Sequence, residues 1–93
     1  MDIEHQGHRK EAKSLKMTDT LVAAIAQHYG NALIASGDLS YLREQDAQGT
    51  LIEAILQEIR FCGVIPAAEV TALRRHLIGQ LPVWQAILRR RQS

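Results

Sequence analysis

Histidine, cysteine and carboxylate side chains are the residues of this sequence that could carry chemistry. His5 and His8 stand three residues apart between Glu4 and Glu11, a spacing that would suit metal ligands on one helical turn. Metal ligands need a fixed geometry, whereas this segment has few large apolar residues that could order it. We therefore interpret both histidines as solvated side chains, and we expect no metal site.

Nucleophilic or acid–base catalysis would need a different set of residues. Cys62 has no histidine near it in the sequence, so we interpret it as a small apolar core residue. His28 and His76 fall among helical residues, and we expect them at the edge of the core. The remaining candidate carboxylates are expected on exposed helix faces: Glu53, Glu58 and Glu69. We predict no catalytic residue, no cofactor and no enzymatic activity.

The composition favours one small helical domain. Of 93 residues, 46% are hydrophobic, but they include only one Trp, one Phe and two Tyr, so we expect an aliphatic core. Leu, Ile and Ala dominate, and Pro and Gly are few, which favours helix over sheet. A formal net charge of +1 gives a weak electrostatic footprint for nucleic acid. No apolar window is long enough to span a membrane and no signal-peptide core is visible, which predicts a cytoplasmic protein.

The first part of the chain divides into an arm and a helix. The residues before Thr18 lack apolar periodicity, which predicts a flexible arm over residues 1–17 and a single helical domain over 18–93. Apolar residues then recur every three or four positions, which predicts a helix over residues 20–36 that Thr18 or Thr20 caps. Gly37 is expected to end this helix in a left-handed conformation.

The middle of the chain predicts two further helices. Asp38 or Ser40 would cap a short helix, and Thr50 opens a T-x-x-E capping box ahead of a helix over residues 50–62. The short helix is expected to turn three residues inward: Leu39, Tyr41 and Leu42. A single long helix over residues 40–62 is the alternative.

The stretch "RFCGVIPAAEV" predicts a tight connection between two helices. Gly63 would take the left-handed position that stops the preceding helix, and Val64 would pack back on Ile59. Pro66 would begin the next long helix, over residues 66–80, which is the third helix of the fold when the short one is left out. Because short connections join antiparallel neighbours, we expect an antiparallel helix hairpin here.

Proline and glycine interrupt the pattern that follows. Gly79 and Pro82 lie inside "LIGQLPVWQAILRRRQS", and a proline within a helix removes a backbone donor and clashes with the preceding turn. We expect the third helix to stop or kink near Gln80, with a short or kinked C-terminal helix after it.

These elements predict an all-α fold: a small helical bundle built on an antiparallel helix hairpin and completed by dimerisation. The apolar face of the helix over residues 50–62 is wider than one antiparallel neighbour covers, which predicts a protein–protein interface. Trp84 with the arginines after it adds the composition of an interface hot spot. The expected interface residues are Leu51, Ile52, Ile55, Leu56, Ile59, Val83, Trp84, Ile87 and Leu88.

A helix-turn-helix-like DNA-binding regulator that uses residues 67–91 is the alternative. Here "AAEVTALRRHL", "IGQLP" and "VWQAILRRR" would form helix, turn and helix. The expected nucleic-acid contacts are Arg74, Arg75, Arg89, Arg90 and Arg91.

A resemblance to known regulators adds to the prediction of a protein–protein interface. The run from "SGD" through "LIEAILQEI" to "EVTALRRHLI" resembles the small helical connector regulators of the YmgB/AriR biofilm type, which are short, cytoplasmic, dimeric bacterial proteins. In size and helicity the chain is also similar to small antiactivators that sequester bacterial transcription factors. Both resemblances imply regulation through protein contact without catalysis. We therefore predict a small non-catalytic regulatory adaptor that binds itself as a homodimer and binds a regulatory protein such as a transcription factor.

Overall fold

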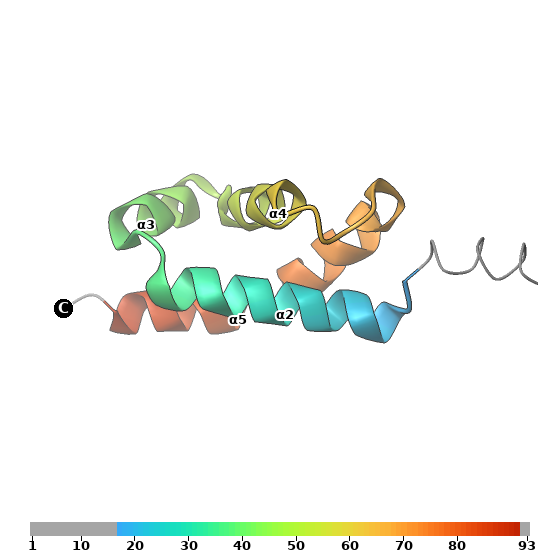
Figure 1. The fold of residues 1–93 in the computed structure, drawn as a ribbon. Coiled ribbons are helices and arrows are strands. Elements are labelled where there is room, and N and C mark those ends of the chain that lie inside the picture. Colours follow the sequence, from blue (N-terminus) through green and yellow to red (C-terminus); the bar gives the residue numbers. More distant parts are fainter. Residues whose placement is uncertain (1–16, 92–93) are drawn as a thin grey trace, which may run out of the picture.

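Helices account for every regular element that the computed structural model describes, which covers residues 17–91. The elements follow in the order α2 (Asp19–Ser36), α3 (Leu39–Gln48), α4 (Leu51–Phe61), the short 3-10 turn η1 (Ala67–Glu69) and α5 (Val70–Arg90) (Figure 1). The all-α class predicted from the composition is confirmed. Of the predicted N-terminal arm, only Met17 is among the described residues.

Side-chain caps define where α2 and α3 begin. Thr18 Oγ1 accepts a hydrogen bond of 3.1 Å from the backbone N–H of Leu21, and Asp38 Oδ1 accepts one of 3.0 Å from Ser40. Each bond satisfies a backbone donor that has no partner within the first helical turn. Thr18 and Asp38 were each one of two caps predicted from the sequence, and α2 lies where the helix over residues 20–36 was predicted.

Gly49 separates α3 from α4, so the alternative of one long helix is wrong. The φ of Gly49 is 78°, in the left-handed region where a glycine has no steric penalty. The capping box expected at Thr50 does not form, because the Thr50 hydroxyl turns back toward α3 and donates to Gln45 Oε1 at 2.6 Å. Glu53, the other half of the expected box, pairs with Arg74 of α5.

Gly63 lies two residues after the end of α4 and has a φ of 74°, which confirms the left-handed conformation predicted to stop this helix. Its N–H donates to the carbonyl of Arg60 over 3.0 Å. The same prediction for Gly37 is wrong, because Gly37 is extended, with φ −73° and ψ 175°. A Cβ at Gly37 would lie 2.6 Å from the carbonyl oxygen of Leu33, so close packing against α2 explains this glycine.

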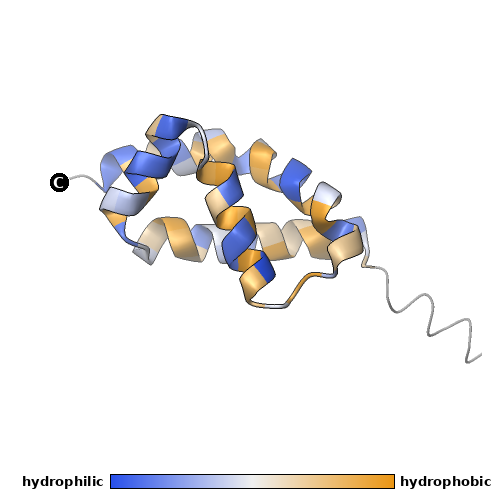
Figure 2. Ribbon diagram, turned by 90° about the horizontal axis from the view of Figure 1, so that it is seen from above, coloured by the Kyte–Doolittle hydropathy of each residue, from blue (hydrophilic) through white to orange (hydrophobic). Residues whose placement is uncertain are grey.

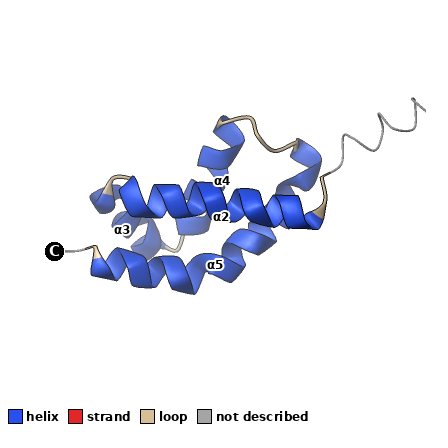
Figure 3. Ribbon diagram, turned by 60° about the horizontal axis from the view of Figure 1, so that its bottom comes forward, coloured by secondary structure: helices blue, strands red, loops and turns tan. Residues whose placement is uncertain are grey.

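α5 is continuous over 21 residues and contains Pro82. The predicted boundary near Gln80 was therefore wrong, and the kink alternative fits Figures 1 and 3, where the axis of α5 changes direction along its length. A helix-interior proline costs about 3 kcal/mol, whereas each large apolar side chain buried contributes about 1.5–3 kcal/mol. One helical stripe buries four such residues on both sides of the proline: Leu73, Leu77, Trp84 and Leu88. Their burial keeps the helix intact.

α2 and α5 lie side by side and run in the same direction. Asp19, at the start of α2, contacts His76 in the first half of α5, and Arg91, just after α5, contacts Ile34 near the end of α2. α3 and α4 form a second layer that carries the chain back, and α4 crosses over the α2–α5 pair obliquely (Figures 1 and 2). The connection through Gly63 is longer than predicted, because Pro66 precedes the 3-10 turn η1 and α5 begins only at Val70. It joins α4 to α5 at this oblique crossing.

The core lies between these two layers and is mainly aliphatic. Every described helix longer than one turn contributes to it: Val22, Ala26, Ile34, Leu42, Leu51, Ile55, Leu56, Ile59, Ile65, Leu73, Leu77, Trp84 and Leu88. Of the three residues expected to face inward from α3, Leu42 is buried and Leu39 is half-buried, but Tyr41 is exposed. The expectation for Tyr41 was wrong because the polar helix α3 buries only a narrow stripe.

Candidate functional site

The structure divides the nine predicted interface residues between the core and the surface. Six of them are buried within this single chain: Leu51, Ile55, Leu56, Ile59, Trp84 and Leu88. Ile52 and Ile87 pack half-buried against the same core, and Val83 is 53% exposed. The apolar face of α4 is covered mainly within the chain, because α2, α3 and α5 all pack against it. Of the nine, Val83 presents the most surface to a partner.

Two of the predicted nucleic-acid contacts form ion pairs with carboxylates of the same chain. Arg74 of α5 pairs with Glu53 of α4, and Arg75 Nη2 lies 3.3 Å from Asp19 Oδ1 of α2. These pairs connect α5 to both of its large neighbours. A phosphate contact by either arginine would compete with a carboxylate of the same chain.

The three arginines at the end of α5 have different surroundings. Arg91 Nη1 donates to the carbonyl oxygens of Ile34 at 2.9 Å and Gly37 at 3.1 Å, so it ties the end of α5 to the end of α2. Cationic donors suit these carbonyls, since the last turn of a helix leaves them without backbone partners. Arg89 and Arg90 are exposed.

The helix-turn-helix layout expected for residues 67–91 is wrong. That motif needs two helices joined by a turn and set at a large angle to each other. The segment "IGQLP" is helical throughout and lies inside α5.

Two residues considered for chemistry, Cys62 and His28, lie at the surface. Cys62 is exposed, so its predicted place in the core was wrong: it follows the last turn of α4, beyond the buried part of that helix. His28 is exposed and packs edge-on against Tyr29, with ring centroids 5.0 Å apart. His5 and His8 lie outside the described residues, and within residues 17–91 no three His, Cys, Asp or Glu side chains gather as metal ligands would.

Asp19 is the centre of a small charged cluster between the starts of α2 and α5. His76 Nε2 donates to Asp19 Oδ1 over 3.0 Å, and Arg75 approaches the same oxygen. The hydrogen bond from His76, with the nearby charges of His76 and Arg75, holds the pKa of Asp19 below its ordinary value. Because Asp19 is exposed, this cluster connects the two helices at their surface.

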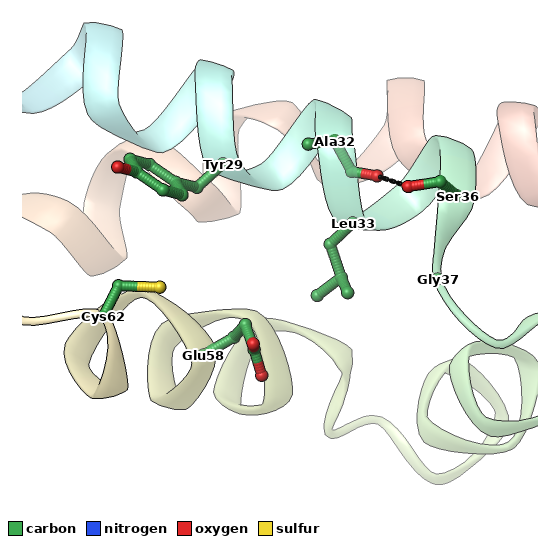
Figure 4. A pocket seen from close by; sticks show the side chains of 7 residues that line it. All are labelled: Tyr29, Ala32, Leu33, Ser36, Gly37, Glu58 and Cys62. Atoms are coloured by element: carbon green, nitrogen blue, oxygen red, sulfur yellow. Dashed lines mark hydrogen bonds between the residues drawn. The ribbon is translucent and has the colours of Figure 1, made fainter.

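A pocket of about 220 Å³ opens between α2 and the end of α4. Figure 4 shows Leu33 pointing from α2 toward α4, with Tyr29 facing Cys62 at one end and Glu58 on the α4 side. The rest of the lining is Ala32, Ser36 and Gly37. Ser36 donates its hydroxyl to the carbonyl of Ala32 at 2.7 Å, so that hydroxyl is already satisfied. The pocket is therefore largely apolar, with one carboxylate and one thiol at its edge.

Phe61 is the chain neighbour of the pocket residue Cys62 and is 91% exposed. It lies three residues after Glu58 and directly before Cys62, both of which line the pocket. Glu58 and Arg60 are exposed, and neither forms an ion pair with another residue of the range 17–91. Sequence reasoning missed Phe61 as a surface residue. The available signal was its position off the stripe that Ile55 and Ile59 define.

A second exposed surface follows α5 on the side away from the core. We call it the outer face of α5: Arg75, Ile78, Gly79, Pro82, Val83, Arg89 and Arg90. Ile78 is 54% and Val83 is 53% exposed, although both are large aliphatic residues. Helical spacing places Gly79 and Pro82 between them. This face therefore combines apolar side chains with three cationic ones.

Comparisons with known proteins give no assignment, since no protein-family model, curated protein or solved structure matches the chain. Among the described helices, none has the length and apolar character needed to cross a membrane.

Proposed function

We propose that this protein is a small non-catalytic regulatory adaptor that acts as a homodimer and binds a regulatory protein such as a transcription factor. The observation that supports this proposal best is the outer face of α5. Ile78 and Val83 stay more than half exposed there after the chain has completed its own core. They lie at the two edges of this face, and exposed large apolar residues are typical of sites where another protein binds.

The chemistry of this face suggests the kind of partner. Arg89 and Arg90 follow the apolar residues along the helix and are exposed. The absence of large side chains at Gly79 and Pro82 lets a partner backbone approach α5 closely. We propose an amphipathic helix with apolar and acidic side chains as the bound element, since its carboxylates would complement the arginines.

The non-catalytic part of the proposal is supported by the roles that candidate acid–base groups already have. Glu53 pairs with Arg74, and Asp19 accepts from His76 and Arg75. Each of these groups holds two helices together, which explains its presence without chemistry.

A capture experiment tests the proposal. Partners would be captured on three baits: the wild-type protein, the double variant Ile78→Asp/Val83→Asp and the control Leu21→Asp. Mass spectrometry identifies the captured proteins, and calorimetry then measures the affinity of each purified partner for the three baits. Leu21 is a comparably exposed apolar residue on α2, so it controls for added charge. We expect the double variant to lose about tenfold or more in affinity, and Leu21→Asp to lose little.

Two results would contradict this function. One is a purified partner that binds the double variant as tightly as the wild type. The other is retention of nucleic acid alone, with an affinity that falls steeply as salt rises, since phosphate contacts release counterions.

A further inference from the structure

We propose that the pocket between α2 and α4 binds Phe61 of a second copy of this chain, so that two protomers exchange their Phe61 rings about a twofold axis. This inference rests on the homodimer in the proposed function and names the surface that forms it. The outer face of α5 takes no part in it.

The first argument is the position of Phe61 relative to the pocket. Glu58 and Cys62 line the pocket, and Phe61 lies one helical turn after Glu58 and next to Cys62 in the chain, so it belongs to the same end of α4 as the pocket. Phe61 is nevertheless 91% exposed and does not line its own pocket. A projecting group and a hollow on the same surface are self-complementary under a twofold axis, because each copy offers both.

The second argument is the size and chemistry of the pocket. At about 220 Å³ it is smaller than the roughly 300–1,000 Å³ of pockets for drug-sized ligands, and it suits one large side chain. Tyr29 supplies an aromatic wall and Leu33 an aliphatic one (Figure 4). Cys62 adds a polarizable sulfur. Aromatic rings pack favourably on all three groups.

The third argument is charge. Arg60 precedes Phe61, and Glu58 lies at the edge of the pocket. Neither has an ion-pair partner within residues 17–91. On one helix, residues two apart do not face each other, so Arg60 cannot pair with Glu58 of its own chain. When Phe61 enters the pocket of the other copy, its neighbour Arg60 is brought to the Glu58 of that copy, which gives two symmetric ion pairs.

The test measures self-association of the full chain by sedimentation or light scattering across a dilution series. Phe61→Ala should raise the dimer dissociation constant about tenfold or more, as loss of a central aromatic contact does. Ile78→Ala, which trims a comparably large exposed side chain of the outer face of α5, should leave it nearly unchanged. Because Phe61 is almost fully exposed, its removal leaves the core intact, and circular dichroism would verify this.

A charge exchange makes the test specific. Glu58→Arg alone and Arg60→Glu alone should each weaken the dimer, because like charges then face each other across the axis. The double variant Glu58→Arg/Arg60→Glu should restore it, which a contact within one chain cannot do at this spacing.

Three outcomes would overturn the inference: a wild-type protein that stays monomeric up to about 100 µM, a dimer that Phe61→Ala leaves unchanged, or a monomer that uses Phe61 to hold a different protein. The proposed partner binding would fail separately, because it depends on Ile78 and Val83.

Discussion

The indole ring of Trp84 in α5 packs directly against the backbone of Gly30 in α2. Trp84 is 0% exposed, and its Nε1 donates a 2.7 Å hydrogen bond to Asn31 Oδ1, the residue next to Gly30. A Cβ at position 30 would overlap the Cζ2 and Cη2 atoms of the ring. The only tryptophan of the chain therefore fits its site because residue 30 has no side chain.

Gly30→Ala should destabilise the protein. The added methyl group must displace a buried indole, and overpacking of this kind costs about 1–3 kcal/mol, while alanine returns up to about 1 kcal/mol of helix propensity. We expect a net loss of about 1–2 kcal/mol. Urea unfolding followed by Trp84 fluorescence measures it.

Gly79→Ala is the matched control, since a Cβ at Gly79 meets no atom within 4 Å. The same substitution there should stabilise the protein by about 0.5–1 kcal/mol. An equal change in the free energy of unfolding at both positions would contradict the close contact between Trp84 and Gly30.

Gly63→Ala should cost about 1–2 kcal/mol, because a Cβ in the left-handed region is strained whatever space surrounds it. No neighbouring atom within 4 Å adds a clash, so the backbone conformation alone accounts for the loss. Gly63→Asn should lose less, since asparagine tolerates this region better. Thermal and denaturant unfolding give the order of stability of wild type and the two variants. An alanine variant as stable as wild type would refute the left-handed conformation at Gly63.

Arg91→Ala should lower the free energy of unfolding by about 1–2 kcal/mol, because it removes charge-assisted hydrogen bonds to the carbonyls of Ile34 and Gly37. Arg90→Ala removes a neighbouring exposed arginine and should change stability by no more than about 0.5 kcal/mol. Chemical denaturation compares the two variants. A loss of the same size in both would assign the effect to the helix dipole instead of the tie to α2.

Acid should remove the contribution of Asp19 to stability. Its pKa in the folded protein is lowered, chiefly by the hydrogen bond from His76, so its stabilising effect is present above its ordinary pKa of 3.8 and is lost as pH falls through the lower folded value. Wild type should be slightly more stable than Asp19→Asn near pH 5, and the two should converge below that pKa. The gap should also shrink with salt, because the pair is exposed. Melting temperatures across this pH range test it, and a gap that persists in strong acid would contradict it.

Local signals in the sequence predicted much of the fold. α2 was placed within one residue at each end, because the apolar period of a helix and a capping threonine are visible within one segment. The left-handed Gly63 could likewise be predicted, since a glycine directly after an amphipathic run and before a proline leaves the backbone few conformations. The pocket and Phe61 were not predicted, because exposure depends on which neighbours arrive.

Patterns within single segments of the sequence are enough to predict the helical class and most of the helix boundaries. Tertiary structure alone decided that α5 continues through Pro82, because burial of the stripe that includes Trp84 outweighs the local cost of the proline. It also decided that α2 runs parallel to α5. This arrangement depends on contacts between residues more than fifty positions apart in the sequence, such as Trp84 and Asn31. Propensities and caps act over only a few residues, so they carry no information about which faces meet.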